Sequence, residues 1–378
     1  MKDTKKDIVI INQDSGYLMI DMANTFAQQA YRVTLISGRL VERNTSLKNE
    51  IKLEKIIKYS KNSVFLRLFT WFWATIQIFF IVKFKYPKSE LLIVSNPPLA
   101  PLLALFLNNK YSILVYDIFP DVLVDSNIFK VNSWLIRSWE KMNKKVYSNA
   151  QKVFTITDGM KSILCKYVET DNIKVVPIWA DVEFLKPIDK SDNLFIKKHA
   201  LQDKFIVLYS GNIAKTGDAD IMIELAKKTH YDADILYLII GEGVNRDMLQ
   251  KQIEEFELNN CIMLPWQKTE MLPYSLSSAS LAVVALGKSV SKIAMPSKLY
   301  SYLAVGSSIL SISPSDSDLA KIVVSNNIGQ NFDVENIDDI HKFIIDLKSD
   351  IALQNQFHSN SLKTTQLFTS KNAYEFIL

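Results

Sequence analysis

Short, continuous apolar runs alternate along this chain with longer segments of helical spacing. In the first half these runs predict six strands, at Asp7–Asn12, Arg32–Ser37, Leu91–Ser95, Ser112–Tyr116, Lys152–Thr155 and Ile173–Val176. A helix is expected between the first two strands, from about Leu18 to Gln29. Apolar runs without a polar alternation are typical of strands buried on both faces. They therefore indicate a parallel sheet with crossover helices.

The pattern pauses at Pro177–Asp192, a linker-like stretch with two prolines, and then starts again. The second half predicts strands at Phe205–Tyr209, Ile235–Ile240, Cys261–Leu264, Leu281–Ala285 and Ser308–Ile312. The fold class predicted is therefore α/β, with two doubly wound, Rossmann-like parallel-sheet domains. A length of 378 residues suits two such domains. We expect domains at 1–185 and 186–360 and a helix at 361–378 that returns to the first. Parallel sheets bind ligands at the carboxyl ends of their strands, so we expect the site in a central cleft that the two domains face.

Composition excludes several classes of protein. Apolar residues make up 48% of the chain and charged residues 22%, as in a folded globular protein. The two cysteines, Cys165 and Cys261, belong to no CxxC pair or Cys/His cluster, which argues against a disulfide scaffold and a structural zinc site. The four histidines lie in linker-like or charged helical surroundings and do not support a catalytic triad. The polar N-terminus predicts no signal peptide.

Positive charge is concentrated in one region, residues 43–88. That region holds ten Lys and Arg residues against two Asp and Glu residues, whereas the whole chain carries only +4. Such a surplus favours an anionic partner, either phosphate-rich lipid or nucleic acid.

Inside the basic region, Leu68–Val82 (LFTWFWATIQIFFIV) carries no charge. Fifteen helical residues reach ~22 Å, which is short of the ~30 Å hydrocarbon core of a bilayer, so a membrane span is not expected. One interpretation is a buried helix of the first domain. The other is a helix in the membrane interface, with Lys61, Arg67, Lys83 and Lys85 on anionic lipid.

Glycine, proline and lysine follow several of the predicted strands of the second half. Ser210, Gly211 and Asn212, with Lys215, follow one strand and open a helix, an arrangement that suits a phosphate. Gly241 and Gly243 form a second turn, and Pro296, Ser297 and Lys298 start another helix. Taken singly, each is equally compatible with a plain structural turn or a capped core helix. Neither GxGxxG nor GxxxxGK[ST] occurs, which disfavours dehydrogenases and P-loop NTPases.

The order of these pieces resembles a known family. The second half carries LYSGNIAK, IIGEG, FELNNCIMLPWQ, SLSSASLAVVAL and MPSKLYSYLAVG; the first half carries YDIFPD, WEKMNKKVYSNAQKVFTITDGM and VVPIWADVEFLKP. Together they resemble the retaining family 4 glycosyltransferases of the GT-B fold, the transferases of capsule, colanic acid and O-antigen assembly. The resemblance extends over most of the chain, and it lies in the ordered recurrence of the motifs rather than in any single one.

The resemblance implies a role for each motif. The Gly211 amide with Asn212 and Lys215 would hold the diphosphate of a nucleotide sugar, and Lys298 with Pro296 and Ser297 would hold it from the other side. Pro265, Trp266 and Gln267 would line the nucleobase. Gly241, Gly243 and Ser301 would lie near the ribose. Across the cleft, Asp14, Ser15, Gly16 and Tyr17 would face the acceptor, and Asp117 and Asp121 would be the catalytic carboxylates.

Four positions depart from the family pattern. Ser301 and Ile293 stand where glutamates are common, and Ser308 stands where a proline is frequent. Tyr116 replaces a histidine that many relatives place before the aspartate. The ribose contact implied at Ser301 and a histidine-assisted step are the two features these changes affect.

No metal site is expected. Three DxD triplets occur, at Asp218–Asp220, Asp232–Asp234 and Asp316–Asp318, and DxD is the metal motif of the other large glycosyltransferase fold. Here they lie at predicted helix starts and in a loop, where aspartate caps helices and favours their dipole.

The sequence thus predicts a retaining glycosyltransferase of bacterial surface polysaccharide assembly. We expect no cofactor, a nucleotide-diphosphate sugar such as a UDP-sugar as co-substrate, and a lipid-linked saccharide acceptor. An anionic membrane surface would bind through residues 61–88, and no nucleic acid is expected. The protein would be cytoplasmic and peripheral on the inner face of the plasma membrane. Two alternatives remain: a GT-B-fold nucleotide-sugar 2-epimerase, and a catalytically weak subunit that only binds nucleotide sugar. Epimerisation needs acid–base residues near the sugar, and the sequence offers no well-placed histidine.

Overall fold

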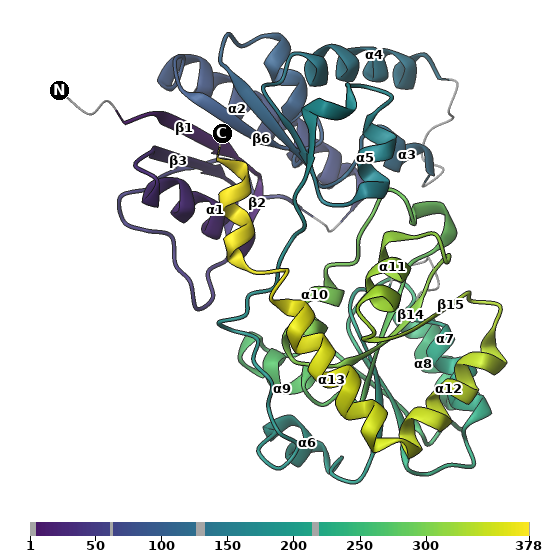
Figure 1. The fold of residues 1–378 in the computed structure, drawn as a ribbon. Coiled ribbons are helices and arrows are strands. Elements are labelled where there is room, and N and C mark those ends of the chain that lie inside the picture. The colour runs from purple at the N-terminus through teal and green to yellow at the C-terminus, as the bar shows by residue number, and fades with distance from the viewer. Residues whose placement is uncertain (1–4, 61–62, 126–132, 214–218, 378) are drawn as a thin grey trace. The chain divides into compact units, whose positions relative to one another are not determined.

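The computed structural model describes residues 5–60, 63–125, 133–213 and 219–377 (Figure 1). The chain divides into two compact units. The first is Met1–Trp179 with Lys292–Ala294 and Ser370–Leu378, and the second is Ala180–Ser291 with Met295–Thr369. The sequence predicted a division near residue 185, and the structure places it between Trp179 and Ala180.

The first unit is built on a seven-stranded parallel sheet. Its strands in spatial order are β5 (Lys52–Lys55), β3 (Arg32–Ser37), β1 (Asp7–Ile11), β6 (Glu90–Val94), β7 (Tyr111–Val115), β8 (Val153–Thr155) and β9 (Ile173–Val175). In the register, Ile10 lies opposite Leu35 on one side and Leu92 on the other, and all three are essentially inaccessible to solvent. A small pair, β2 (Asp14–Ser15) and β4 (Arg39–Leu40), extends from the carboxyl edge.

Helices cover the faces of this sheet. They are α1 (Tyr17–Gln28), α2 (Val64–Lys85), η1 (Ala100–Leu105), α3 (Asp121–Asp125), α4 (Trp134–Ser148), α5 (Asp158–Leu164) and η2 (Thr170–Asn172). Crossovers between parallel strands are right-handed, and the direction in which successive strands are added to the sheet reverses at β1. The helix α1 therefore lies on the opposite face of the sheet from α2, η1 and α4. Figure 1 shows α2 and α4 together, away from α1, and η1 packs against both of them.

The C-terminal segment η5 (Ser370–Phe376) belongs to the first unit and packs on α1. The Phe376 ring lies 4.9 Å from the Phe154 ring, and Lys174 pairs with Glu375 at 2.7 Å. Tyr374 Oη donates to Gln28 Oε1 of α1 at 3.0 Å.

The second unit has a six-stranded parallel sheet. Its spatial order is β12 (Cys261–Leu264), β11 (Ile235–Ile240), β10 (Phe205–Ser210), β13 (Leu281–Ala285), β14 (Ser308–Ile312) and β15 (Gly329–Phe332). Its helices are α6 (Leu194–His199), α7 (Ile221–Lys228), α8 (Arg246–Glu255), η3 (Thr269–Met271), α9 (Leu272–Leu276), η4 (Lys288–Val290), α10 (Lys298–Ala304), α11 (Asp318–Ser325), α12 (Ile337–Ser349) and α13 (Ile351–Thr365). Tyr237, Phe343 and Phe357 are among the large side chains of its core.

The helix that contains the uncharged run is longer and more exposed than the sequence predicted. The helix α2 has 22 residues, ~33 Å, and it is the one helix in the described part of the chain that is long and apolar enough to cross a membrane. The uncharged run of 15 residues therefore underestimated the length of this helix. The alternative of a buried core helix is also wrong, because only Thr70, Ala74, Ile78 and Val82 are buried.

Candidate functional site

The order of strands in the second sheet places a switch point at its carboxyl edge. Strands β10 and β13 are neighbours, but the chain continues from β10 toward β11 and from β13 toward β14, in opposite directions. The loops that follow these two strands therefore diverge, and such a switch point is where open parallel sheets bind ligands. The glycines and the lysine singled out in the sequence gather at this edge.

Lys298 and Gly211 lie side by side here. A Cβ atom added to Gly211 would lie only 2.6 Å from Lys298 Nζ, and the same ammonium lies 3.7 Å from the centre of the Tyr209 ring. Only glycine at position 211 leaves room for the ammonium group at the end of β10. Two segments 87 residues apart thus place a cation at the switch point, while the phosphate contact predicted for Lys298 stays a prediction.

The expected role of the Gly211 amide needs correction. Its N–H donates to Ile240 O at 3.0 Å, so it is occupied and does not point at an open phosphate site. The glycines serve close packing of the turns instead: a side chain on Gly241 would collide with Gly211 O, and one on Gly243 with Ile213 O. Ile213 N also donates to Glu242 O at 2.9 Å. The two turns are therefore locked together.

Two buried tyrosines hold the loop that carries Gly211. Ser210 N donates to Tyr302 Oη at 2.8 Å, and Tyr209 Oη donates to Asn212 O at 2.9 Å. Burial raises the pKa of Tyr302 far above its ordinary value, so this hydroxyl stays neutral. Since Tyr302 belongs to α10, the same short helix positions both the loop and Lys298.

The remaining donor-side residues are distributed along the same edge. Pro265 and Trp266 follow β12 and are exposed, and Gln267 Nε2 donates to Pro265 O at 2.8 Å. Ser301 lies one helical turn after Lys298, partly exposed, while Pro296 and Ser297 immediately precede α10. Asn212 is exposed. Lys215 lies outside the described residues, so its predicted contact stays a prediction.

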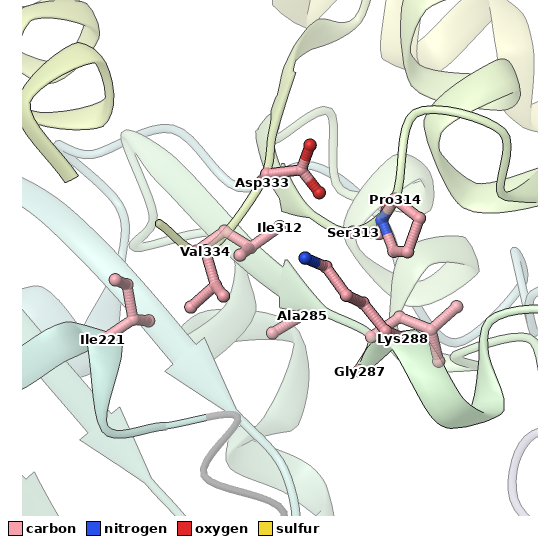
Figure 2. Close-up of a pocket in the computed structure, with 10 residues that line it drawn as sticks. Ile221, Ala285, Gly287, Lys288, Ile312, Ser313, Pro314, Asp333 and Val334 are labelled. Carbon is pink, nitrogen blue, oxygen red and sulfur yellow. The ribbon is translucent and has the colours of Figure 1, made fainter. Parts of the chain in front are cut away.

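A pocket that the sequence did not indicate lies on the other half of this edge. It has a volume of about 120 Å³ and is lined by the ends of β13, β14 and β15, with Lys288, Ser313 and Asp333 among its polar residues (Figure 2). Lys288 also pairs with Glu335 at 2.9 Å, and this pair raises the pKa of Lys288. None of the predicted donor-binding residues lines this pocket. The only signal in the sequence was that Gly287 and Pro314 follow predicted strands.

In the first unit, the predicted acceptor residues have mostly structural roles. Asp14 forms a two-point ion pair with Arg39, at 2.6 and 2.9 Å, which joins β2 to β4. The Ser15 side chain is buried and accepts from Ser37 Oγ at 3.0 Å. Tyr17 Oη donates to Trp179 O at 2.8 Å. Gly16 is different, because a Cβ there would meet nothing within 4 Å.

Asp117 lies two residues beyond β7 at the carboxyl edge of the first sheet. Its side chain reaches solvent, yet the surrounding protein limits its hydration, and this desolvation raises its pKa. The loop is fixed by Ser95 Oγ, which accepts from Tyr116 N at 3.0 Å and Asp117 N at 3.2 Å. Burial raises the pKa of Tyr116, so a neutral phenol stands where many relatives have histidine.

Asp121, the second predicted catalytic carboxylate, is engaged in the fold. Lys166 forms a close ion pair with Asp121 Oδ1, and Tyr167 Oη donates to Oδ2 at 2.8 Å. Burial and the Asp121 charge raise the pKa of Tyr167, which keeps this donor protonated. Asp121 therefore fastens α3 to the segment after α5, and Asp117 is the more accessible carboxylate.

The described residues contain no group of three or more His, Cys, Asp or Glu side chains that could hold a metal ion. In the DxD triplets, Asp232 pairs with Lys348 at 2.7 Å and Asp318 with Lys321 at 3.5 Å. Asp218 lies outside the described residues.

Comparison with known proteins gives matches of three kinds: a family model, related proteins and solved structures. The family model described as glycosyl transferases group 1 matches residues 191–364, all of which except Lys292–Ala294 lie in the second unit. WbjE of Pseudomonas aeruginosa, a probable glycosyltransferase, is 25% identical over 248 residues, covering 63% of this chain and 60% of WbjE. WcaI of Escherichia coli (strain K12), whose name assigns it to colanic acid biosynthesis as a glycosyl transferase, is 29% identical over 161 residues, covering 42% of this chain.

These alignments span 60% of WbjE and 39% of WcaI, so the chain matches well under two thirds of either relative. Among solved structures, Alr3699/HepE of Anabaena in complex with UDP-glucose superposes with a TM-score of 0.73 at 12% identity, covering 98% of this chain and 97% of HepE. The same protein in complex with UDP gives 0.72. At this identity the likeness shows a shared fold.

Proposed function

We propose that this chain, a member of the GT-B glycosyltransferases of family 4, transfers a sugar from a nucleotide-diphosphate sugar. The acceptor is a lipid-linked saccharide, and the reaction retains the anomeric configuration of the sugar. One observation carries the proposal: Lys298 Nζ lies against Gly211, at the switch point of the second sheet. UDP and UDP-glucose in HepE support a uridine nucleotide as the donor's leaving group. The name of WcaI, which refers to colanic acid biosynthesis, supports polysaccharide assembly as the setting.

The donor half acts on the leaving group. As the bond from the anomeric carbon to the diphosphate breaks, its electron pair moves to the diphosphate, and negative charge develops there. Lys298 is fixed by the Tyr209 ring and by α10, so it meets that charge without reorganisation. Trp266, exposed just after the edge strand β12, offers a ring on which the base stacks.

The acceptor half supplies a base. The acceptor hydroxyl forms the new bond to the anomeric carbon on the same face from which the diphosphate leaves, so the configuration is retained, and this hydroxyl must lose its proton. Asp117 is suited to receive it, because a raised pKa makes its carboxylate a stronger base than an ordinary aspartate. Among the described residues its carboxylate has no ion-pair partner, in contrast to those of Asp14 and Asp121.

We also propose a cytoplasmic location on the inner face of the plasma membrane. Both cysteines are free thiols, with Cys165 exposed, which suits a reducing compartment. A lipid-linked acceptor would bring the enzyme to that surface.

The test uses purified protein and labelled nucleotide sugars, with and without a lipid-linked acceptor. Transfer supports the proposal, whereas isomerisation without acceptor would indicate an epimerase, and binding without turnover a non-catalytic subunit. Binding is read from thermal stability, since a ligand at 100 times its dissociation constant stabilises by about 2.7 kcal/mol.

Lys298→Ala should lower transfer at least tenfold, because a charge-assisted contact to phosphate contributes about 1.5–3 kcal/mol. The matched control is Lys251→Ala, an exposed lysine on α8 that should leave transfer unchanged. Equal kinetics in the two variants would remove Lys298 from the donor site.

A further inference from the structure

The helix α2 has a large apolar face that no other segment in the described part of the chain covers. The buried residues Thr70, Ala74, Ile78 and Val82 recur every four positions and form one narrow stripe. On the opposite face lie exposed aromatic side chains, with Phe65 76% and Phe84 71% accessible; the others are Phe69, Phe72, Trp73 and Phe80. Exposed apolar patches of this kind mark protein or membrane interaction sites.

Two further elements pack beside α2 and also expose apolar side chains. The segment η1 packs against both α2 and α4, and Phe119 joins the two helices, with its ring 6.1 Å from Trp71 of α2 and 6.2 Å from Trp139 of α4. Trp134 at the start of α4 is 79% exposed, and Phe106, directly after η1, is 68% exposed. Apolar side chains thus project from three neighbouring elements of the first unit.

The charges around this face have one dominant sign. No acidic residue occurs in α2, and exposed Lys83 and Lys88 lie at its end. On α4, Lys141 and Lys145 follow Trp134 along the side opposite the buried Ile136 and Tyr147. Aromatic rings bordered by lysines fit the boundary between acyl chains and anionic headgroups. A protein partner or a second copy would not require this surplus of positive charge.

Bonds along its whole length hold α2 to the first unit. Gln13 Nε2 donates to Thr70 O at 3.0 Å, Ile57 N donates to Gln77 Oε1 at 2.8 Å, and Lys85 Nζ pairs with Glu54 at 2.8 Å. Because these contacts hold α2 to the domain at Thr70, Gln77 and Lys85, the helix cannot leave the domain to cross a bilayer while the fold is intact. Its length alone would suffice for a span.

We infer that α2, η1 and the start of α4 form a docking face that inserts into an anionic bilayer with α2 parallel to the membrane plane. The inference deepens the proposed function by naming the surface that brings the enzyme to a lipid-linked acceptor. The docking itself requires no sugar transfer.

The experiment measures sedimentation of the full chain with vesicles of phosphatidylcholine, with and without phosphatidylglycerol. The wild type should bind at least tenfold more tightly when phosphatidylglycerol is present and should be released by high salt. Replacing Lys83, Lys88, Lys141 and Lys145 with glutamine should weaken binding at least tenfold. The matched control replaces four exposed lysines of the second unit, Lys197, Lys198, Lys251 and Lys363, and should bind as the wild type does.

Insertion is read from tryptophan quenching by brominated lipid. Trp73→Phe and Trp134→Phe should each remove part of the quenching, whereas Trp266→Phe in the second unit should not. Phe72→Ser with Trp73→Ser should abolish binding, while circular dichroism checks that the fold persists.

Three results would overturn the inference: no binding to anionic vesicles at low salt, resistance to extraction by salt and alkaline carbonate as expected of a spanning helix, or a lipid-free dimer that Phe72→Ser and Trp73→Ser dissociate. If vesicle binding is found but sugar transfer is not, the docking face stands and the proposed function fails. If sugar transfer is found but vesicle binding is not, the proposed function stands and the docking face fails.

Discussion

At the scale of single residues, Gly211 matters because of what its missing side chain leaves room for. A Cβ there would lie 2.6 Å from Lys298 Nζ, the end of a flexible side chain that can move aside. We therefore expect Gly211→Ala to fold normally but to displace the ammonium and weaken donor binding about tenfold, or about 1.4 kcal/mol. In Lys298→Ala the same glycine change should cost little, because the group it displaces is gone. Donor titrations of both single variants and the double variant measure this coupling. Additive losses would contradict it.

Substitutions of Asp117 and Asp121, the two predicted catalytic carboxylates, should separate an effect on activity from an effect on stability. Asp117→Asn should reduce transfer at least a hundredfold with the fold intact. Since desolvation raises the pKa of Asp117, the folded state disfavours its charged form, and the asparagine variant should be no less stable at neutral pH. Asp121→Ala should instead lower the free energy of unfolding by about 1–3 kcal/mol, because Lys166 and Tyr167 lose their partner. Transfer kinetics and urea denaturation of both variants measure the two effects. An Asp121→Ala variant that is stable but inactive would contradict the assignment of Asp121 to stability and not to catalysis.

Residue identities could be predicted from the sequence better than their contacts could. The turns after the predicted strands located Gly211 and Gly241, and a predicted helix start located Lys298, although each of them taken singly is equally compatible with a structural role. That Asp14 pairs with Arg39, and Asp121 with Lys166, depends on chain segments 25 and 45 residues away. Sequence pattern holds no information on such pairings, so buried or engaged carboxylates were indistinguishable from available ones.

At the scale of elements, Glu54 of β5 fastens the end of α2. Burial alone would raise its pKa, but hydrogen bonds from Lys85, Lys52 and Tyr86 outweigh it and lower the pKa to about 2, from 4.5. Because the folded pKa lies below the unfolded one, the stabilisation is complete above pH 4.5 and is lost as the pH falls toward 2. Glu54→Gln should therefore be less stable at neutral pH, and its unfolding free energy should fall less between these pH values.

Denaturation at several pH values measures this difference. Glu335→Gln is the control, because Glu335 and its partner Lys288 are both mostly exposed, and such a pair contributes little. A pH dependence of Glu54→Gln equal to that of the wild type would show that the anchor does not stabilise the fold.

The sequence revealed the central strands and two of the edge strands, β9 and β12, and missed the other two edges. Strands β1, β6, β7, β10 and β11 are buried apolar runs and were readily predicted. Strands β5 (KLEK) and β15 (GQNF) carry polar residues because one side of an edge strand faces solvent, and neither was predicted. The helix α2 was underestimated for a related reason: Arg67, Lys83 and Lys85 interrupt the hydropathy but not the helix.

At the scale of the whole molecule, the repeat of one pattern in both halves predicted two parallel sheets. Each sheet reverses its strand order once, so each has a single switch point at its carboxyl edge. In the first sheet this point lies between β1 and β6, where Gln13 and Ser95 follow the strands, and in the second between β10 and β13. The pocket of Figure 2 escaped prediction because loops from three strands enclose it, and the sequence does not show how those loops turn.

In the proposed reaction, the charge that leaves with the nucleotide must be compensated by the protein or by a metal ion, and this choice determines how the rate depends on divalent ions. The described residues offer Lys298 at the switch point and no cluster of three metal-binding side chains. We therefore expect transfer to proceed at an unchanged rate in EDTA, because a fixed ammonium stabilises the developing diphosphate without a divalent ion. Lys298→Ala should then respond differently from the wild type: added Mg²⁺ should recover part of its lost rate by replacing the missing charge. Initial rates of both proteins across a Mg²⁺ and Mn²⁺ series make the comparison. If the wild type loses its transfer activity in EDTA and recovers it only with one of these ions, then a metal ion, and not Lys298, compensates the charge of the leaving diphosphate.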